Sequence, residues 1–556
     1  MPTMNACQKI AAGVLCVFVT GLTAGAARPQ VVVDPLRAPV LSGLRHSPAE
    51  RLTIVSKGSP ATLTGLTVDL GASTDVADIL SVGLYAVSDA SSLSRDNCLG
   101  SVDTQGRAKV TLPLAMKADS DTTRMWLGLT LRDSVDLSHR IEARVVALAT
   151  DKGRARISPY APAAHRTGVA LHTPGADGIA SCRIPGIATA PDGTLLAIYD
   201  ARHDSRRDLQ GNIDIALRRS ADGGATWSPM QTVLDMGTWG GLPERYNGVS
   251  DACILVDPAT GRIFVAGLWM HGVLDENGKW IEGIDDKSTY WIHQWKARGS
   301  QPGTGLKETC QFLITHSDDN GLTWSFPDNI TSDTKRPEWW LYAPAPGQGV
   351  ALADGTLVLP TQGRDSTGLP FSNITYSTDH GRTWTASNPA YDDVTECNAV
   401  QLSDGSVMLN MRDNRNRGHR DPNGRRVCVT TDLGATWREH PTSRSALTEP
   451  TCMASLYRHR YTGADGSDAS ILLFANPDHH KVRKNLTLKA SLDDGLTWPE
   501  EHQIIFDETR GMGYSSITSV GEEAVGILYE SGLADLVFIR IDLDEILNHS
   551  NNNTSK

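Results

Sequence analysis

The sequence has no surplus of basic residues. Its 556 residues include 52 Lys and Arg against 64 Asp and Glu, which gives a formal net charge of -12 at pH 7. Binding to a nucleic-acid backbone needs a basic surface, so we expect no nucleic-acid partner. The 40% hydrophobic and 21% charged residues are typical of a soluble globular protein and exclude a disordered, collagen-like or polytopic membrane chain.

Cysteine is sparse and shows no metal-binding pattern. None of the nine cysteines lies in a CxxC motif, and seven remain once the first 27 residues are set aside. Because seven is odd, at least one thiol stays free or pairs between chains, and neither a zinc site nor a disulfide framework is supported. The sequence also lacks clustered His and Asp ligands, a P-loop and a dinucleotide-binding fingerprint, so we expect no metal and no organic cofactor.

The first 27 residues have the pattern of a cleaved signal peptide. An apolar run rich in Ala and Gly covers residues 10–27 behind Lys9, and Ala24-Gly25-Ala26 provides the small residues that a signal peptidase needs. We therefore expect an exported protein, periplasmic, cell-surface or secreted, with no membrane span after cleavage. An uncleaved membrane anchor is the alternative, because the run is just long enough to cross a bilayer.

The length of the chain predicts more than one domain. Between residues 28 and 160, short runs alternate apolar and polar residues with Gly, Asp and Ser between them, which predicts a small β-sandwich. A linker with neighbouring prolines follows at residues 161–165. A larger domain is then expected over residues 165–547, and a polar tail over residues 548–556.

An octapeptide occurs five times in the larger domain. Its pattern is S/T-x-D-x-G-x-T-W, at residues 220–227, 317–324, 377–384, 430–437 and 491–498. Each copy follows a strand-like run, and its Asp-x-Gly core suits a hairpin turn. At roughly 60 residues a blade, the domain is predicted to be a six-bladed β-propeller with one blade that lacks the octapeptide, so the fold class is all-β. The wide first interval predicts a Trp-rich insertion at about residues 235–305, in a position where insertions often border binding sites.

The octapeptides are those of the sialidases, and the larger domain resembles the bacterial exo-α-sialidase family over essentially its whole length. Arg183-Ile184-Pro185 stands where the first arginine motif of that family opens the first blade, and Arg412 and Arg483 match its second and third arginines. The resemblance implies that these three arginines bind one carboxylate. Guanidinium groups bind carboxylates in a bidentate manner and with permanent charge, as a sialic acid requires.

Two predicted hairpins bear on whether these residues gather in one place. An Asp-Gly turn after the first arginine motif pairs residues whose numbers sum to about 385, which brings Arg183 opposite Arg202 within a residue or so. Like charges across a ladder are destabilising, so two facing arginines indicate an anion or acid between them. An Asp-Gly turn further along the chain puts Glu396 and Arg412 at the same open end of a second hairpin.

The resemblance also implies the catalytic residues. Tyr514, in a Gly-Tyr-Ser-Ser run, matches the nucleophilic tyrosine of the family, and Glu396 matches the glutamate paired with it. Asp208 corresponds to the acid/base aspartate on a mobile loop, with Asp204 as the rival. A phenol needs a base to take its proton, and Glu396 is suited to that task.

Three further residues are expected to contact substrate. Arg202 and Asp251 match positions that, in the family, hold hydroxyl or amide groups on the far side of the sugar. Gln362 is expected at the rim of the site. Each of the three could equally be a polar group that is satisfied at the end of a strand.

These residues predict a retaining exo-α-sialidase that releases terminal sialic acid from glycoproteins, glycolipids or oligosaccharides through a tyrosyl-enzyme intermediate. A neutral phenol avoids the repulsion that a carboxylate nucleophile would meet at an anomeric carbon bearing a carboxylate. A trans-sialidase, including an intramolecular one, would share all the catalytic residues, whereas a non-catalytic sialic-acid lectin could dispense with some of them.

Overall fold

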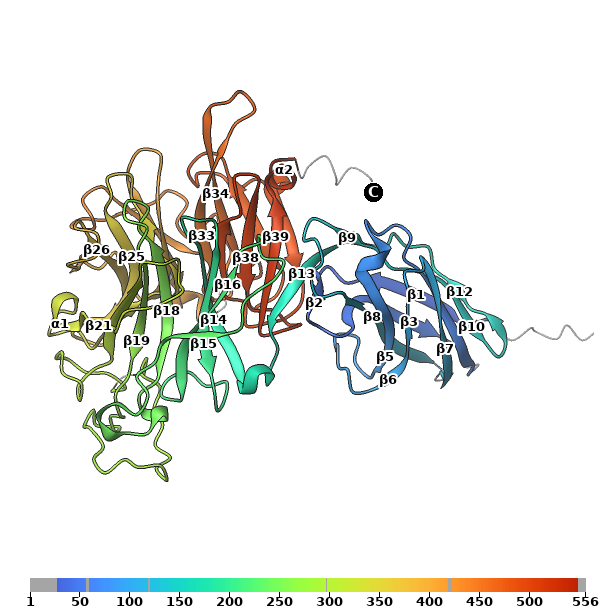
Figure 1. Cartoon of the computed structure of the whole chain (residues 1–556), viewed down its shortest axis with the longest axis horizontal. Coiled ribbons are helices and arrows are strands. Elements are labelled where there is room, and N and C mark those ends of the chain that lie inside the picture. The colour runs from blue at the N-terminus through green and yellow to red at the C-terminus, as the bar shows by residue number, and fades with distance from the viewer. Residues whose placement is uncertain (1–27, 57–59, 119–120, 297, 419–422, 549–556) are drawn as a thin grey trace, which may run out of the picture.

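The computed structural model describes residues 28–56, 60–118, 121–296, 298–418 and 423–548 (Figure 1). Nearly all regular structure in these residues is β-strand, and their two α-helices, α1 (Thr331–Thr334) and α2 (Leu543–Leu547), have only four and five residues. This confirms the predicted all-β class. The expected signal peptide and nearly all of the expected polar tail lie outside the described residues.

Two sheets form within residues 28–160, on the right of Figure 1. The first has the order β12 (Arg156–Ile157), β1 (Gln30–Pro35), β3 (Ser47–Val55), β8 (Thr122–Leu131), β5 (Ile79–Val87), β6 (Cys98–Asp103), and the second β11 (Gly153–Arg154), β10 (Arg144–Thr150), β4 (Thr62–Asp69), β7 (Lys109–Lys117). In β7 the buried residues Val110, Leu112 and Leu114 alternate with exposed ones. They share one core with Leu52 and Ile54 of β3, so the two sheets pack against each other.

Six further sheets follow in the rest of the described chain. The first three contain β14 (Ser181–Thr189), β15 (Leu195–Arg202), β16 (Ile213–Ser220), β17 (Gln231–Leu234); β18 (Val249–Val256), β19 (Ile263–Trp269), β20 (Gln311–Ser317), β21 (Asp328–Asn329), β23 (Gly347–Gln348); and β22 (Leu341–Pro344), β24 (Val350–Ala351), β25 (Leu357–Arg364), β26 (Pro370–Ser377), β27 (Thr385–Ala386), β28 (Tyr391–Asp392). The next two contain β29 (Val394–Gln401), β30 (Val407–Asp413), β31 (Arg426–Thr430), β32 (Arg438–Glu439); and β33 (Ser455–Thr462), β34 (Asp468–Pro477), β35 (Leu486–Ser491), β36 (Gln503–Asp507).

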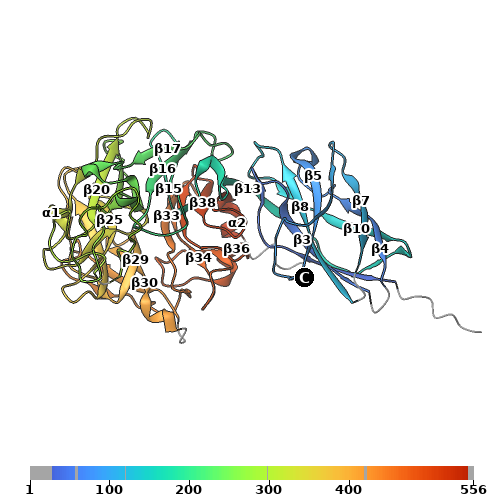
Figure 2. The same cartoon turned by 90° about the horizontal axis from the view of Figure 1, so that it is seen from below.

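The sixth sheet joins the beginning of this region to its end. It contains β37 (Ser515–Ser519), β38 (Ala524–Tyr529), β39 (Leu536–Asp542) and β13 (His165–His172), and β13 pairs antiparallel with β39 (Figure 1 and Figure 2). Two short strands from the N-terminal part, β2 (Val40–Ser42) and β9 (Arg140–Ile141), also pair with β13. An ion pair of 2.8 Å between Arg140 and Glu545 adds to this junction. The two parts of the chain are therefore linked by backbone pairing as well as by side chains.

The repeated octapeptides are turns that lead from the third strand of a sheet to its outer strand, in five of the six sheets. In the first copy, the Ser220 hydroxyl donates to Asp222 Oδ1 (2.8 Å) and accepts from the Gly224 N–H (2.9 Å), while Asp222 accepts from the Thr226 N–H (3.0 Å). The same three bonds recur in the other four copies. These bonds satisfy the polar groups of each turn within the octapeptide itself, which agrees with the structural role predicted for it.

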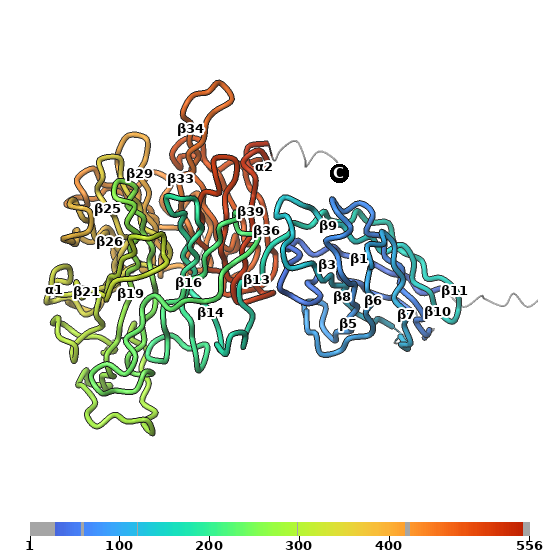
Figure 3. Tube along the Cα trace, in the orientation of Figure 1, coloured from blue at the N-terminus to red at the C-terminus, as the bar shows by residue number. Residues whose placement is uncertain are grey.

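The insertion expected at residues 235–305 is shorter than predicted. Residues 249–256 and 263–269 form β18 and β19, the first two strands of the second sheet. The long connection covers residues 270–310, and it is the green to yellow-green excursion at the lower left of Figure 3. The prediction was wrong because the interval between two octapeptides also contains the opening strands of a sheet.

Candidate active site

A cavity of about 550 Å³ collects eight of the nine predicted site residues. The eight that line it are Arg183, Asp208, Asp251, Gln362, Glu396, Arg412, Arg483 and Tyr514. The ninth, Arg202, does not line it. Residues from the long connection 270–310 also contribute to the wall, among them His293 and Trp295.

β-Bulges shape the ends of the strands that reach this cavity. In β14, β18 and β29 the antiparallel register shifts at the end that carries the predicted site residues. The shifted residues include Ile184 and Asp251, with φ of 61° and 57°, and Glu396. A bulge bends its strand and re-aims a side chain, so these local distortions turn Asp251 and Glu396 toward the cavity.

The three predicted arginines are held by different partners. Arg183 donates from Nε to Glu530 Oε1 (2.7 Å) and from Nη2 to Oε2 (3.3 Å). Arg412 Nη1 lies 2.5 Å from Glu396 Oε2. Arg483 donates from both Nη atoms to two backbone carbonyls, at 2.9 and 3.2 Å. Fixed guanidinium groups of this kind provide a preorganised site for an anion.

Tyr514 and Glu396 form a hydrogen-bonded pair in the same cavity. The Tyr514 hydroxyl donates to Glu396 Oε1 and accepts from Arg412 Nη1 at 3.1 Å. Burial, followed by the charge of Glu396, raises the pKa of Tyr514 well above its usual value. Burial acts to raise the pKa of Glu396 too, but Arg412 and the Tyr514 hydroxyl outweigh it and the pKa of Glu396 is lowered. A neutral phenol therefore faces an ionised carboxylate.

Asp208 accepts hydrogen bonds from two side chains, a guanidinium and an imidazole. Arg202 Nη1 donates to its Oδ1 at 2.7 Å, and His293 Nε2 lies 3.1 Å from its Oδ2. The Trp295 N–H donates to His293 Nδ1 (3.1 Å), so the hydrogen of the imidazole is on Nε2, which donates a hydrogen bond to Asp208. Burial acts to raise the pKa of Asp208, but the His293 hydrogen bond and the charges of Arg202 and Arg183 outweigh it and lower that pKa below its usual value.

The predicted pairing of Arg183 with Arg202 is off by two residues. In the structure Arg202 is opposite Ser181 and Arg183 is opposite Asp200. The pairs next to the turn already sum to 384 rather than 385, and the bulge in β14 shifts the pairs beyond it by one more residue. Arg202 is fully buried, and Asp200 accepts from its Nη2 at 2.9 Å. Arg202 thus positions Asp208 from behind the cavity wall. The rival acid Asp204 is exposed and is not among the cavity residues.

Asp251 and Gln362 are buried members of the wall. The Asp251 N–H donates to Asp200 Oδ1 at 3.1 Å. Burial and then the charges of Asp200 and Glu396 raise the pKa of Asp251 well above its usual value, so its neutral form is favoured relative to an exposed carboxyl group. Gln362, expected at the rim, is 1% exposed and donates to the Pro344 carbonyl at 3.3 Å.

Among the residues that were not predicted, two hold predicted site residues in place. Glu530 accepts hydrogen bonds from Arg183, from the Ile184 N–H (2.9 Å) and from the Tyr514 N–H (3.1 Å), so it fixes an arginine and the tyrosine at once. In the sequence it is one more polar residue after a strand. His293 lies in the Trp-rich segment that the sequence marked as a possible border of a binding site, and that composition was the available signal.

The described residues contain no group of three His, Cys, Asp or Glu arranged to hold a metal ion. Five arginines line the cavity against four carboxyl groups. The local charge is therefore positive on a chain whose net charge is -12. None of the helices in the described part of the chain has the length and apolar character needed to cross a membrane.

Comparison with known proteins places this geometry in a family. Residues 193–528 match the model of the BNR repeat-like domain. A sialidase of Bacteroides fragilis (strain YCH46) is 35% identical over 95% of this chain and 98% of its own length. A sialidase of Micromonospora viridifaciens is 34% identical over 64% of this chain, which spans 51% of that protein. The solved structure of the Hadza microbial sialidase Hz136 is 33% identical, with a TM-score of 0.81, and the match covers 93% of this chain and 100% of that one. This chain belongs to the bacterial exo-α-sialidase family.

Proposed function

We propose that the protein is an exo-α-sialidase that hydrolyses terminal α-linked sialic acid from glycoproteins, glycolipids or oligosaccharides. The observation that carries the proposal is the Tyr514–Glu396 pair, which shares one cavity with three arginines. Membership of the family supports sialylated glycoconjugates as the substrates.

Arg183, Arg412 and Arg483 bind the carboxylate of the sugar in this proposal. Guanidinium groups stay charged at every physiological pH and match a carboxylate with two parallel N–H donors. Glu530 keeps Arg183 in place, so little side-chain entropy is lost when the anion binds. The local positive charge attracts an anionic sugar to a chain that would otherwise repel it.

Tyr514 acts as the nucleophile and Glu396 as its base. Glu396 takes the phenolic proton as the oxygen attacks the anomeric carbon, and Arg412, at 3.1 Å from that oxygen, stabilises the developing phenolate charge. A neutral phenol approaches a carbon that already bears a carboxylate more easily than a carboxylate does. Water then displaces Tyr514, and two displacements give retention of configuration.

Asp208 supplies the proton to the leaving oxygen and later activates the water. Its low pKa opposes the first of these tasks, because a general acid must be protonated. A substrate carboxylate bound to Arg183 offsets part of the positive charge that acts on Asp208, so substrate binding raises the pKa of Asp208 toward the range where it can donate.

For the architecture we infer a six-bladed β-propeller over residues 165–547, preceded by a β-sandwich over residues 28–160. Six sheets in sequence, the last completed by β13, and two sheets that share a core support this arrangement. We also propose that the protein is exported through the segment 1–27, on the basis of its sequence pattern.

The test is a set of sialosides with defined α2,3, α2,6 and α2,8 linkages, followed by NMR from the first turnovers. We expect free sialic acid that appears first as the α-anomer, with Tyr514→Phe as the inactive control. First appearance of the β-anomer would exclude the two-displacement mechanism. An anhydro-sugar or a transferred sialyl group as the main product would make the protein a trans-sialidase, and binding without turnover would make it a lectin.

A further inference from the structure

A second cavity, of about 350 Å³, lies at the far end of the strands that form the active site. Strand β14 carries Arg183 at the active site and Ala188 at the second cavity, and β29 likewise carries Glu396 and Ala399. At about 3.3 Å per residue, the five steps from Arg183 to Ala188 span roughly 16 Å and the three steps from Glu396 to Ala399 roughly 10 Å. The second cavity is therefore distinct from the catalytic one.

Its walls are partly apolar, and its polar side chains include no carboxylate. Ile254, Val256, Val350 and Leu456 form much of the apolar surface, and none of the described residues that line the cavity is Asp or Glu. A volume of this size is in the range of small-molecule sites.

Most polar side chains of the second cavity already have partners. Arg458 donates to the Gln401 carbonyl (2.9 Å) and pairs with Asp494. The Tyr457 hydroxyl lies 3.0 Å from the Ser519 hydroxyl. These groups shape the wall and need no ligand.

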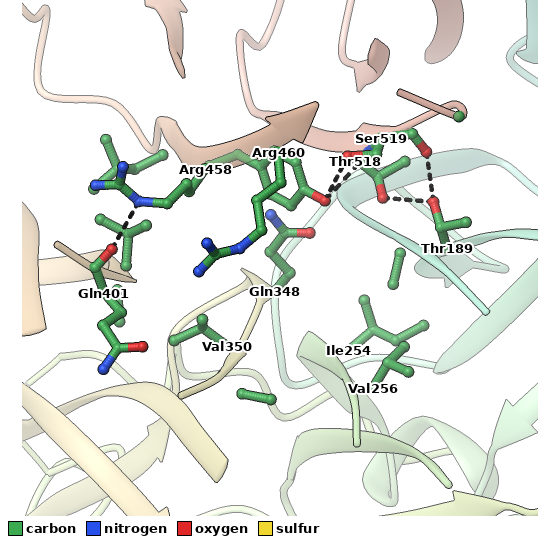
Figure 4. Close-up of a pocket in the computed structure, with 18 residues that line it drawn as sticks. Thr189, Ile254, Val256, Gln348, Val350, Gln401, Arg458, Arg460, Thr518 and Ser519 are labelled. Carbon is green, nitrogen blue, oxygen red and sulfur yellow. Dashed lines mark hydrogen bonds between the residues drawn. The ribbon is translucent and has the colours of Figure 1, made fainter. Parts of the chain in front are cut away.

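Gln348 and Arg460 are different. The side chain of Gln348 is 9% exposed and makes no hydrogen bond to any described residue, and the guanidinium of Arg460 has neither a hydrogen bond nor an ion pair within the described part of the chain. In Figure 4 both side chains project into the cavity, Arg460 from β33 and Gln348 from β23. The Arg460 side chain is exposed, and the Gln348 amide faces the same cavity without a protein partner, so the hydrogen-bonding groups of both are available to a ligand there.

We propose that this cavity binds a small organic anion, a carboxylate attached to an apolar ring or chain. The carboxylate accepts hydrogen bonds from the Arg460 guanidinium and the Gln348 amide, and the apolar part packs against Ile254, Val256 and Val350. Inorganic phosphate would leave these apolar walls unfilled. The site is independent of the proposed catalysis, because neither Arg460 nor Gln348 lines the active site.

The test uses the full chain and 4-fluorobenzoate as the probe, with binding followed by ¹⁹F NMR. Because the active-site arginines also attract carboxylates, binding is measured in an Arg412→Lys background that weakens that second interaction. Arg460→Gln in this background should lower the affinity about tenfold or more. Arg438→Gln, which removes one exposed charge outside both cavities, should leave the affinity unchanged.

Two further ligands and a second variant test whether the carboxylate itself is recognised. The uncharged 4-fluorobenzamide and inorganic phosphate should bind at least about tenfold more weakly than 4-fluorobenzoate. Gln348→Leu should also weaken 4-fluorobenzoate, and neither Arg460→Gln nor Gln348→Leu should change sialoside turnover in the otherwise native chain. No binding of 4-fluorobenzoate at millimolar concentration, or binding that survives Arg460→Gln with an unchanged melting temperature, overturns the proposal.

Discussion

His293 offers the sharpest test of how the site sets its own pH dependence. His293→Phe removes the hydrogen bond to Asp208 Oδ2 and keeps a ring in the same position. A hydrogen bond to a charged group contributes about 1.5–3 kcal/mol when it is buried. The Asp208 side chain is 45% exposed, so water screens the interaction and about 1 kcal/mol remains, which corresponds to about 0.7 pKa unit.

The sign follows from which form of Asp208 the bond favours. His293 stabilises the ionised carboxylate, so its loss raises the pKa of Asp208 and the limb of the kcat/KM profile that reports this group moves about 0.7 unit to higher pH. His293→Gln retains an N–H donor and should restore most of the native profile. The assay is kcat/KM against pH for native protein and both variants. Superimposable profiles for native protein and His293→Phe would refute the assignment of His293 as a residue that positions and tunes Asp208.

Four other changes probe the rest of the molecule. Tyr514→Phe should lower kcat at least about a hundredfold with little change in KM, measured by steady-state kinetics, since the arginines remain; near-native turnover removes Tyr514 as nucleophile. Arg412→Lys should lower kcat/KM at least about tenfold, because the planar fork is lost, and an unchanged value removes Arg412 from the anion site. Burial raises the pKa of Glu50 from 4.5 to about 8, so the folded protein loses stability as the pH rises between these two values. Glu50→Gln should therefore raise the melting temperature at pH 8 but not at pH 4, and equal gains at both pH values would contradict this. Asp432→Ala should lower the melting temperature while turnover per folded molecule stays constant, and lost turnover at an unchanged melting temperature would make that turn part of the site.

The octapeptide turns could be predicted because their interactions are local. The carboxylate of each turn accepts its hydrogen bonds from residues at most four positions away, as Asp222 does from Thr226. The local sequence is therefore enough to predict the turn. The same holds for the strand pattern, where alternation in segments such as β7 specifies the buried face without reference to distant residues.

Register was harder to predict than the existence of strands. The pairing of Arg183 with Arg202 assumed a regular ladder and a turn centred one residue off. The turn accounts for one residue of the error, and the bulge between Arg183 and Gly186 shifts every pair beyond it by one more. In the second hairpin the bulge between Val394 and Cys397 leaves Glu396 and Arg412 at the same end, as predicted, and the two side chains form an ion pair. A bulge depends on how neighbouring sheets bend, and a single strand sequence carries little trace of it.

The groups that set the charge states of the site depend on distant parts of the chain. Glu530 is 347 residues from Arg183 in the sequence. Its carboxylate can bind Arg183 only because the fold brings β38 and β14 close together. His293 belongs to the connection 270–310, which no strand pattern constrains. Tyr514 and Glu396 thus lie at strand ends, whereas Asp208 and His293, which tunes it, lie on connections between strands. We therefore expect relatives with a different loop at this position to keep the same chemistry and to differ in its pH dependence.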